Sequence, residues 1–388
     1  MAIKLQWDIF CAVVDNFGDI GICWRLSRQL VAEHGQQVRL WVDDLASFKQ
    51  LCHELDSSAS SQQLAGVQIC HWQPNTDWQQ FEVAQVVVEA LACTIPLPYQ
   101  QQMAKSRQPL IWLNLEYLSA EPWIEGCHTL ASPQPHLPLT KYFFFPGFTK
   151  ASGGLLFEPA WLLQLQSWQQ DHSQHPAFWQ QLGIADAANF ACKVSLFAYS
   201  HCYLAQLLQY WQQGEQRTLC LVPPGELATQ LQASYPELVH SSRLALGQLT
   251  LVLMPFIAQP DYDKLLHLCD INFVRGEDSI IRAQWAKRPF IWQIYRQAEQ
   301  AHLLKLNAFS LLYCQQLNAL SAAAVQQLFT AWNTEQPLLA AWQNFSENLY
   351  AIQQHNIGWS AHLQSHGDLA SNLVRFAEKK FIMLRNFS

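Results

Sequence analysis

Hydrophobic and polar positions form two kinds of pattern along the chain, and the order of these patterns predicts strands that alternate with helices. Short runs rich in β-branched and aromatic residues are typical of buried strands. In the first half of the chain these runs cover residues 7–14, 37–42, 66–70, 84–89 and 109–115. After the first run, apolar residues recur with helical spacing between 22 and 31. This alternation predicts a parallel, doubly wound α/β sheet.

The second half of the chain repeats the same alternation. Strands are predicted at residues 192–197, 218–222, 249–253, 271–274 and 290–294, and helices at 322–329, 338–349 and 370–381. Because 388 residues exceed the size at which a single core stops growing, we expect two domains. Parallel sheets hold ligands at their carboxyl edges, so two such sheets predict a cleft between those edges.

The domain boundaries follow from composition. We expect a first α/β domain at residues 1–160, a glutamine-rich connecting segment at 161–186, a second α/β domain at 187–365, and a final helical stretch at 366–388 that could cross back onto the first domain. The composition of the connecting segment predicts no functional role.

The alternation stops between residues 119 and 154, where prolines, glycines and the aromatic run Tyr142–Phe145 predict a long loop. Long loops in compact enzymes are usually functional. Aromatic and proline-rich sequence can equally cover an open sheet edge, and the sequence favours neither interpretation.

Composition and charge exclude several classes of protein. Half of the residues are hydrophobic, 14% are charged and the net charge is −7, so no nucleic-acid-binding surface is expected. No apolar run reaches the roughly 18 residues of a membrane span, and the beginning of the chain lacks a signal-peptide pattern. The 11 cysteines are scattered without a C-x-x-C pair. We therefore expect reduced core cysteines, no metal and a cytoplasmic protein.

The first candidate site is a turn that contains two carboxylates and two glycines. Its sequence is Asp15-Asn16-Phe17-Gly18-Asp19-Ile20-Gly21, between the first predicted strand and the first predicted helix. Glycines at 18 and 21 predict a sharp turn. One acid could cap the helix while the other is solvated, but the helix end suits only one of them. We therefore favour a functional pair of Asp15 and Asp19.

The second candidate site follows the predicted strand at 271–274. The sequence Arg275-Gly276-Glu277-Asp278-Ser279 runs into a helix, where free backbone N–H groups and the helix dipole favour phosphate. Arg275 can add a charge-assisted contact. Asp278 or Ser279 could instead be a simple N-cap. Because the chain contains neither G-x-G-x-x-G nor G-x-x-x-x-G-K-[ST], an NAD site and a P-loop are disfavoured.

A third motif, Asp261-Tyr262-Asp263, has the D-x-D spacing that binds a divalent metal in some glycosyltransferases. It follows Pro260 and precedes an apolar helical pattern. This context is typical of a helix start, so we favour capping over metal binding.

Several long strings resemble one known family. They are WDIFCAVVDNFGDIGICWRL, LNLEYLSAEPWIEGCH, LTKYFFFPGF, VRGEDSIIRAQWAKRPFIWQIY and AHLLKLNAF. They resemble the elongation factor P maturation arginine rhamnosyltransferases, the EarP family, over nearly the whole chain. The resemblance implies two Rossmann-like domains in the GT-B arrangement, the first binding the acceptor and the second the nucleotide sugar.

The resemblance also implies a reaction and its participants. The donor would be dTDP-β-L-rhamnose, the acceptor one arginine of elongation factor P, and the transfer inverting and independent of metal or other cofactors. The implied catalytic residues are Asp15, Asp19 and Glu277, and the remaining loop residues Asn16, Phe17, Gly18 and Gly21 lie on the acceptor side. The implied donor contacts are Tyr199, Phe256, Gln259, Arg275, Asp278, Ser279 and Tyr295.

The chemistry of the residues fits this implication. A guanidinium is a poor nucleophile because it stays protonated up to a pKa of about 13.8. Two carboxylates can hold it and accept the proton released, with Asp19 favoured as base and Asp15 as its orienting partner. The chain departs from the family string IYPQ at Ile294-Tyr295-Arg296-Gln297, where the local turn is in question.

Two other functions fit the same sequence. One is a GT-B glycosyltransferase with a different acceptor, such as a lipid or a glycan. The other is a non-catalytic protein that binds a nucleotide sugar and elongation factor P. The presence of two acids in the first turn weighs against binding alone.

Overall fold

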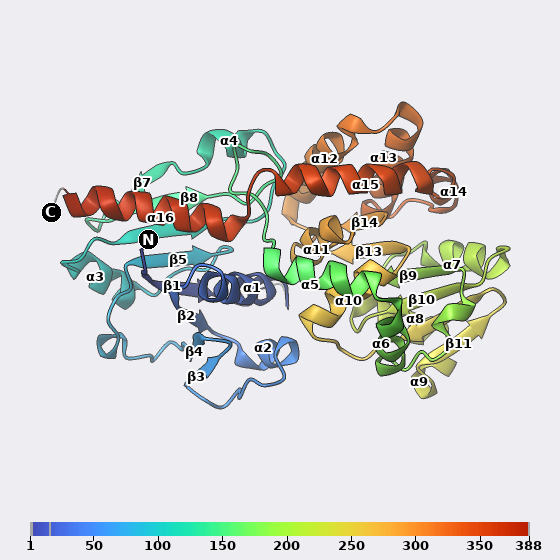
Figure 1. The fold of residues 1–388 in the computed structure, drawn as a ribbon, viewed down its shortest axis with the longest axis horizontal. Coiled ribbons are helices and arrows are strands. Elements are labelled where there is room, and N and C mark those ends of the chain that lie inside the picture. The colour runs from blue at the N-terminus through green and yellow to red at the C-terminus, as the bar shows by residue number, and fades with distance from the viewer. Residues whose placement is uncertain (1–2, 15–16, 387–388) are drawn as a thin grey trace. The chain divides into compact units, whose positions relative to one another are not determined.

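The structure is a computed structural model that describes residues 3–14 and 17–386. The chain divides into two compact units, one formed by residues 1–158 and 363–388, and the other by residues 159–362. We call them unit 1 and unit 2. The connecting segment expected at 161–186 belongs to unit 2, and the last helix belongs to unit 1 (Figure 1).

Unit 1 contains one sheet with eight strands among the described residues, in the order β3-β4-β2-β1-β5-β6-β8-β7. Its strands are β1 (Gln6–Cys11), β2 (Gln37–Val42), β3 (Ser61–Leu64), β4 (Val67–His71), β5 (Val86–Ala90), β6 (Ile111–Leu115), β7 (Ala131–Pro133) and β8 (Thr140–Phe144). Its helices are α1 (Gly18–Ala32), α2 (Leu45–Leu51), α3 (Leu97–Lys105), α4 (Trp123–Cys127) and α16 (Leu369–Asn386). The six central strands are parallel, whereas the outermost strands β3 and β7 pair antiparallel with their neighbours.

Unit 2 contains a sheet with six strands among the described residues, in the order β11-β12-β10-β9-β13-β14. Its strands are β9 (Cys192–Leu196), β10 (Thr218–Val222), β11 (Arg243–Leu246), β12 (Leu249–Leu253), β13 (Ile271–Arg275) and β14 (Phe290–Gln293). Its helices are α5 (Pro159–Gln170), α6 (His175–Gln181), α7 (Leu204–Gln213), α8 (Glu226–Ser234), α9 (Glu237–His240), α10 (Gln259–Leu268), α11 (Asp278–Ala286), α12 (Ala301–Tyr313), α13 (Ala319–Asn333), α14 (Leu339–Glu347) and α15 (Leu349–Gln364). Only β11 is antiparallel to its neighbour.

The predicted fold class, an α/β protein with two Rossmann-like sheets, is confirmed. Apolar strands are buried on both faces, as β5 and β10 are along their whole length, because helices cover both sides of a parallel sheet. Large aromatic side chains fill these cores. In unit 1, Phe10 stacks on Trp41, and in unit 2, Phe273 packs against Trp332. Such rings bury large apolar areas and fix their neighbours by preferred ring geometries.

The prediction that residues 119–154 form only a loop is wrong. This stretch contains α4, β7 and β8, and the aromatic run Tyr142–Phe145 is largely strand β8. The antiparallel strand β7 closes the edge of the sheet beyond β8. Phe376 of α16 packs on Tyr142 and Phe144, so the last helix covers the same strand (Figure 1). The structure thus favours the interpretation of this stretch as a cover for the sheet edge.

Candidate functional site

Each sheet has one position where the strand order reverses, and a charged turn lies at each. In unit 1 the order reverses between β1 and β5, and β1 leads into the turn that contains Asp19. In unit 2 the order reverses between β9 and β13, and β13 ends at Arg275. In open α/β sheets this reversal opens a crevice at the carboxyl ends of the strands, which is where ligands bind.

Asp19 is a buried carboxylate in the first turn of α1. It is 2% exposed, and its Oδ2 accepts a hydrogen bond from the backbone N–H of Val14 at 3.0 Å. Asp43, which follows β2, accepts the neighbouring N–H of Val13 at 2.9 Å. Two carboxylates therefore hold the segment that follows β1, and they place Asp19 at the carboxyl edge of the sheet.

The alternative in which Asp19 serves as a cap or a solvated acid is wrong. The N-cap of α1 is Phe17, and Asp19 is buried. The predicted role of Gly18 and Gly21 in a sharp turn is also wrong, because both are part of α1 and the N–H of Gly21 makes a helical bond to the carbonyl of Phe17 at 2.9 Å. Asp15 and Asn16 lie outside the described residues, so the predicted pairing of Asp15 with Asp19 stays a prediction.

In unit 2, Arg275 lies between two aromatic rings that follow strand β9. Its guanidinium carbon is 4.6 Å from the ring centroid of Phe197 and 4.5 Å from that of Tyr199. Within the part of the chain that the structure describes, no carboxylate forms an ion pair with this guanidinium. The rings face the cation without neutralising it. Arg275 is therefore held in place with its charge available to an anion.

The turn from Arg275 to Ser279 is fixed by main-chain contacts. Gly276 has a φ of 62°, its N–H donates to the carbonyl of Gln293 at 3.2 Å, and its own carbonyl accepts from the indole of Trp292 at 2.8 Å. The hydroxyl of Ser279 donates to the carbonyl of Arg275. This arrangement ties the first turn of α11 to the main chain of Arg275.

The N-cap of α11 is Glu277, which makes no side-chain capping bond. The alternative in which Asp278 or Ser279 is the N-cap is therefore wrong. Glu277 and Asp278 are half-buried, and Ser279 is buried. Both acids therefore lie at the start of α11, shortly after Arg275 in the chain.

The structure brings several other predicted donor contacts together. The amide of Gln259, at the start of α10, lies 3.3 Å from the carboxylate of Asp278. The ring of Tyr295 is edge-on to Tyr199 with centroids 6.1 Å apart. Phe256 follows β12 and is half-buried. These residues follow the carboxyl ends of β9, β12, β13 and β14 in the chain.

Three further residues of this region were not among the site residues predicted from the sequence. Phe197 forms one wall of the arginine site, and Tyr262 packs edge-on against Phe197 with centroids 5.8 Å apart. Gly225 has a φ of 150°, and a Cβ there would be 3.7 Å from Nη2 of Arg275. The sequence Pro223-Pro224-Gly225 after a strand was the one signal for the glycine. The sequence carried no signal for Phe197 and Tyr262 beyond their positions at a strand end and a helix start.

The D-x-D motif is occupied by cations of the chain itself. Asp261 pairs with Lys264 at 3.0 Å, and Asp263 pairs with the buried Arg282 at 2.8 Å. Neither aspartate caps α10, whose N-cap is Ala258, so the favoured capping interpretation is wrong. The motif is a pair of salt bridges. In the described residues no three His, Cys, Asp or Glu side chains gather as a metal site requires.

The departure from the family string at Arg296 has a local partner. Arg296 pairs with Glu335, and the pKa of this glutamate is lowered by the hydrogen bond from that guanidinium. The preceding Ile294 donates its N–H to the side chain of Asn333 at 2.9 Å. The turn that carries Tyr295 is therefore tied to the end of α13 on both sides.

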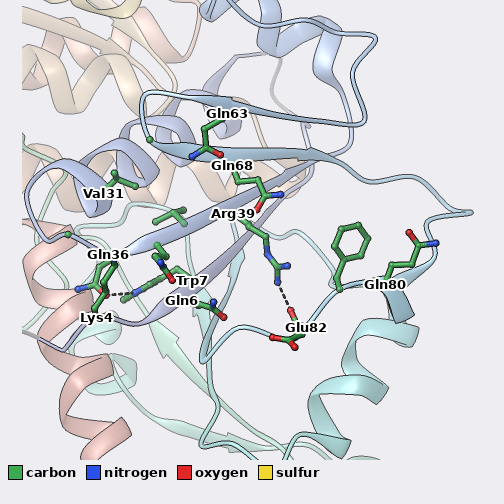
Figure 2. Close-up of a pocket in the computed structure, with 15 residues that line it drawn as sticks. Lys4, Gln6, Trp7, Val31, Gln36, Arg39, Gln63, Gln68, Gln80 and Glu82 are labelled. Carbon is green, nitrogen blue, oxygen red and sulfur yellow. Dashed lines mark hydrogen bonds between the residues drawn. The ribbon is translucent and has the colours of Figure 1, made fainter.

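A pocket of about 730 Å³ lies at the opposite edge of the unit 1 sheet, at the amino ends of β1, β2 and β4 (Figure 2). Arg39 points into it, but its guanidinium is bound by the buried carboxylate of Asp8 at 2.6 Å and by the carbonyl of Glu82 at 2.6 Å. The charge of Arg39 is thus already neutralised. The pocket is remote from the carboxyl edge, so we do not assign the chemistry to it.

Comparison with known proteins places this fold and site in a class. Two doubly wound sheets, each with a charged turn where its strand order reverses, have the architecture of a two-domain glycosyltransferase of the Rossmann-like kind. The chain matches the family described as "Elongation-Factor P (EF-P) rhamnosyltransferase EarP" over residues 7–378. The chain belongs to this family, which confirms the resemblance found in the sequence.

Individual relatives agree with the family. The protein-arginine rhamnosyltransferase of Pseudomonas putida is 45% identical, with 96% of this chain and 99% of the relative covered. That of Neisseria meningitidis serogroup B is 33% identical, with 96% of each chain covered. A solved structure described as the basis for EarP-mediated arginine glycosylation of translation elongation factor EF-P matches with a TM-score of 0.67 and 33% identity, covering 97% of this chain and 99% of the other.

Proposed function

We propose that this protein transfers L-rhamnose from dTDP-β-L-rhamnose to one arginine side chain of elongation factor P, with inversion and without a metal. The observation that carries the proposal is Arg275, whose guanidinium lies between Phe197 and Tyr199 and whose main chain is hydrogen-bonded to Ser279 in the first turn of α11. A guanidinium and a helix N-terminus at one point form a site for the diphosphate of a nucleotide sugar. The sugar and the acceptor protein are those of the similar protein-arginine rhamnosyltransferase and of the similar EarP structure.

The donor side divides into three tasks. Arg275 and the backbone N–H groups of α11 stabilise the negative charge that develops on the departing diphosphate. Phe256 is the candidate surface for the thymine ring, and Tyr295 is the candidate contact for the sugar. Ser279 holds the turn through the main chain of Arg275. Glu277 is the candidate for steadying the sugar hydroxyls or the oxocarbenium-like charge at the anomeric carbon.

The acceptor side rests on Asp19. The attacking guanidinium must lose a proton as its nitrogen forms the new bond to the anomeric carbon, while the bond from that carbon to the diphosphate oxygen breaks and its electron pair leaves with dTDP. Asp19 takes the proton, and Asp15 orients the guanidinium through paired N–H contacts. Because two neighbouring carboxylates titrate as a pair, the assignment of the base to Asp19 is part of the proposal.

The proposal is tested by the intact mass of elongation factor P after incubation with this protein and dTDP-β-L-rhamnose. We expect a gain of one deoxyhexose, and none when the acceptor arginine is replaced by lysine. Full activity in excess EDTA is expected for the metal-free route. No gain in mass, with dTDP still bound, would favour the non-catalytic alternative, and transfer to a lipid or glycan instead would favour the other glycosyltransferase.

A further inference from the structure

Helices α10 and α11 of unit 2 are joined by two contacts, one helical turn apart. The outer contact is between the amide of Gln259 and the carboxylate of Asp278, 3.3 Å apart at the helix starts. The inner contact is between Asp263 and Arg282. There Nε meets Oδ1 at 3.0 Å and Nη2 meets Oδ2 at 2.8 Å. The outer contact lies at the proposed donor site. The inner contact lies one turn further along both helices, away from that site.

The spacing in each helix links the two contacts. Residues four apart lie on one face of a helix, so Gln259 shares a face of α10 with Asp263, and Asp278 shares a face of α11 with Arg282. A bidentate pair with a planar guanidinium tolerates little change in angle or distance. The inner contact therefore sets how far apart, and in what rotation, the two helix starts lie.

The inner contact is also completely buried. The side chains of Asp263 and Arg282 are each 1% exposed. The carboxylate receives a third hydrogen bond from the indole of Trp161 on α5, at 2.8 Å. Burying two charges carries a large desolvation cost, and apolar pairs of similar size are often as stable. A fully hydrogen-bonded ion pair at this place is thus better explained by geometric precision than by stability.

We propose that Asp263, Arg282 and Trp161 are positioning residues for the nucleotide-sugar donor. They hold the starts of α10 and α11 so that Gln259 and Asp278 present their side chains to the donor, next to Arg275. This inference rests on the proposed function, because it assumes that the donor binds at these helix starts. It also gives Trp161, in the segment for which the sequence predicted no role, a part in donor binding.

The experiment is calorimetric titration of dTDP into the full-length protein, combined with thermal unfolding and the separate KM values for donor and acceptor. Arg282→Met removes the charge and keeps the stem of the side chain. We expect the Kd for dTDP and the KM for the donor to rise about tenfold or more, as misplacement of binding groups by about 1 Å can cause, while the KM for elongation factor P stays as in the wild type.

The double variant Asp263→Leu with Arg282→Met separates positioning from stability. Its apolar pair is expected to restore thermal stability towards the wild-type value but not the affinity for dTDP. Trp161→Phe, which removes one hydrogen bond and keeps a ring, is expected to weaken dTDP binding about two- to fivefold. It keeps the test decisive if Arg282→Met does not fold.

Arg243→Met is the matched control. Arg243 also forms a bidentate pair, with Asp186, in the same unit but on β11 and partly exposed. It should leave the affinity for dTDP unchanged. A cycle that combines Arg282→Met with Gln259→Ala should show losses in dTDP affinity that are not additive, because Arg282 is proposed to act by positioning the contact that Gln259 makes with the donor.

Folded variants of Asp263, Arg282 or Trp161 that bind dTDP like the wild type would overturn the inference, and so would wild-type affinity in the apolar double variant. A wild-type protein that does not bind dTDP at all would instead overturn the proposed donor site. The two failures are therefore distinguishable.

Discussion

The turn after β1 in unit 1 and the turn after β13 in unit 2 have the same architecture but differ in their charged side chains. Each follows a parallel strand where the strand order reverses, and each leads into the N-terminus of a helix. In unit 1 a carboxylate, Asp19, lies in the first turn of the helix and offsets its positive end. In unit 2 a guanidinium-bearing residue, Arg275, ends the strand that leads into the helix.

This difference shows what the shared architecture decides and what it leaves to individual side chains. The sheet topology determines where a ligand site can form. The sign of the charge at that place determines which ligand suits it, a cation at Asp19 and an anion at Arg275. The proposed function uses both sites, with the cationic acceptor at Asp19 and the anionic donor at Arg275.

The largest effect that would test this comparison is expected from Asp19→Asn. The change keeps the shape and the acceptor for the N–H of Val14 but removes the basicity. Transfer should fall about 10²-fold or more, as measured by the rate of mass gain of elongation factor P.

Calorimetry on the same variant provides the control. Its affinity for dTDP should equal that of the wild type, because unit 2 alone is proposed to bind the diphosphate. Normal turnover of Asp19→Asn would remove this carboxylate from the chemistry.

Arg275→Ala should have the opposite profile. Loss of charge-assisted hydrogen bonds of about 1.5–3 kcal/mol predicts a rise in the Kd for dTDP of about ten- to a hundredfold. Titration calorimetry measures it, with Arg275→Lys as the control that keeps the charge but loses the planar fork. An unchanged Kd in the alanine variant would mean that the phosphates bind elsewhere.

A smaller effect is expected from Gly225→Ala. At a φ of 150° a side chain is strained, and the new Cβ would lie 3.7 Å from Nη2 of Arg275. We expect the free energy of unfolding to fall by about 1–3 kcal/mol and the affinity for dTDP to fall with it. Denaturant unfolding and calorimetry would show this. Gly183→Ala is the control for dTDP affinity. Gly183 also has a positive φ, but nothing lies within 4 Å of a Cβ there, so its substitution should lower stability and leave the affinity for dTDP unchanged.

The smallest effect is expected on the stability of unit 1 at acidic pH. Burial lowers the pKa of His128 in unit 1 from 6.5 to about 4, and its Nδ1 accepts the N–H of Phe145. Because the unfolded chain binds the proton first, this contribution to stability is complete above pH 6.5 and is lost as the pH falls towards 4. We expect a loss of about 1 kcal/mol by pH 6.

Comparing denaturant unfolding of the wild type and His128→Gln between pH 7 and pH 5 isolates this residue. The variant should lose less stability than the wild type over this range. Parallel curves for the two proteins would show that His128 does not titrate as stated.

Much of the fold could be predicted from the sequence because parallel strands buried on both faces are continuous apolar runs. Strands β3, β7, β8 and β11 were missed because they are short, mostly partly exposed strands at or next to a sheet edge. At the sites, Arg275 and Asp19 were found because charge beside a strand end is visible in the sequence. Phe197 and the partnership of Asp263 with Arg282 were not, since ring and ion-pair contacts join residues far apart in the chain.

The most direct test of the central claim is a crystal structure of the protein with dTDP and an arginine-containing segment of elongation factor P. The account predicts the diphosphate within hydrogen-bond distance of Arg275 and the acceptor guanidinium within hydrogen-bond distance of Asp19. A diphosphate bound away from the start of α11, or an acceptor arginine bound away from Asp19, would contradict it.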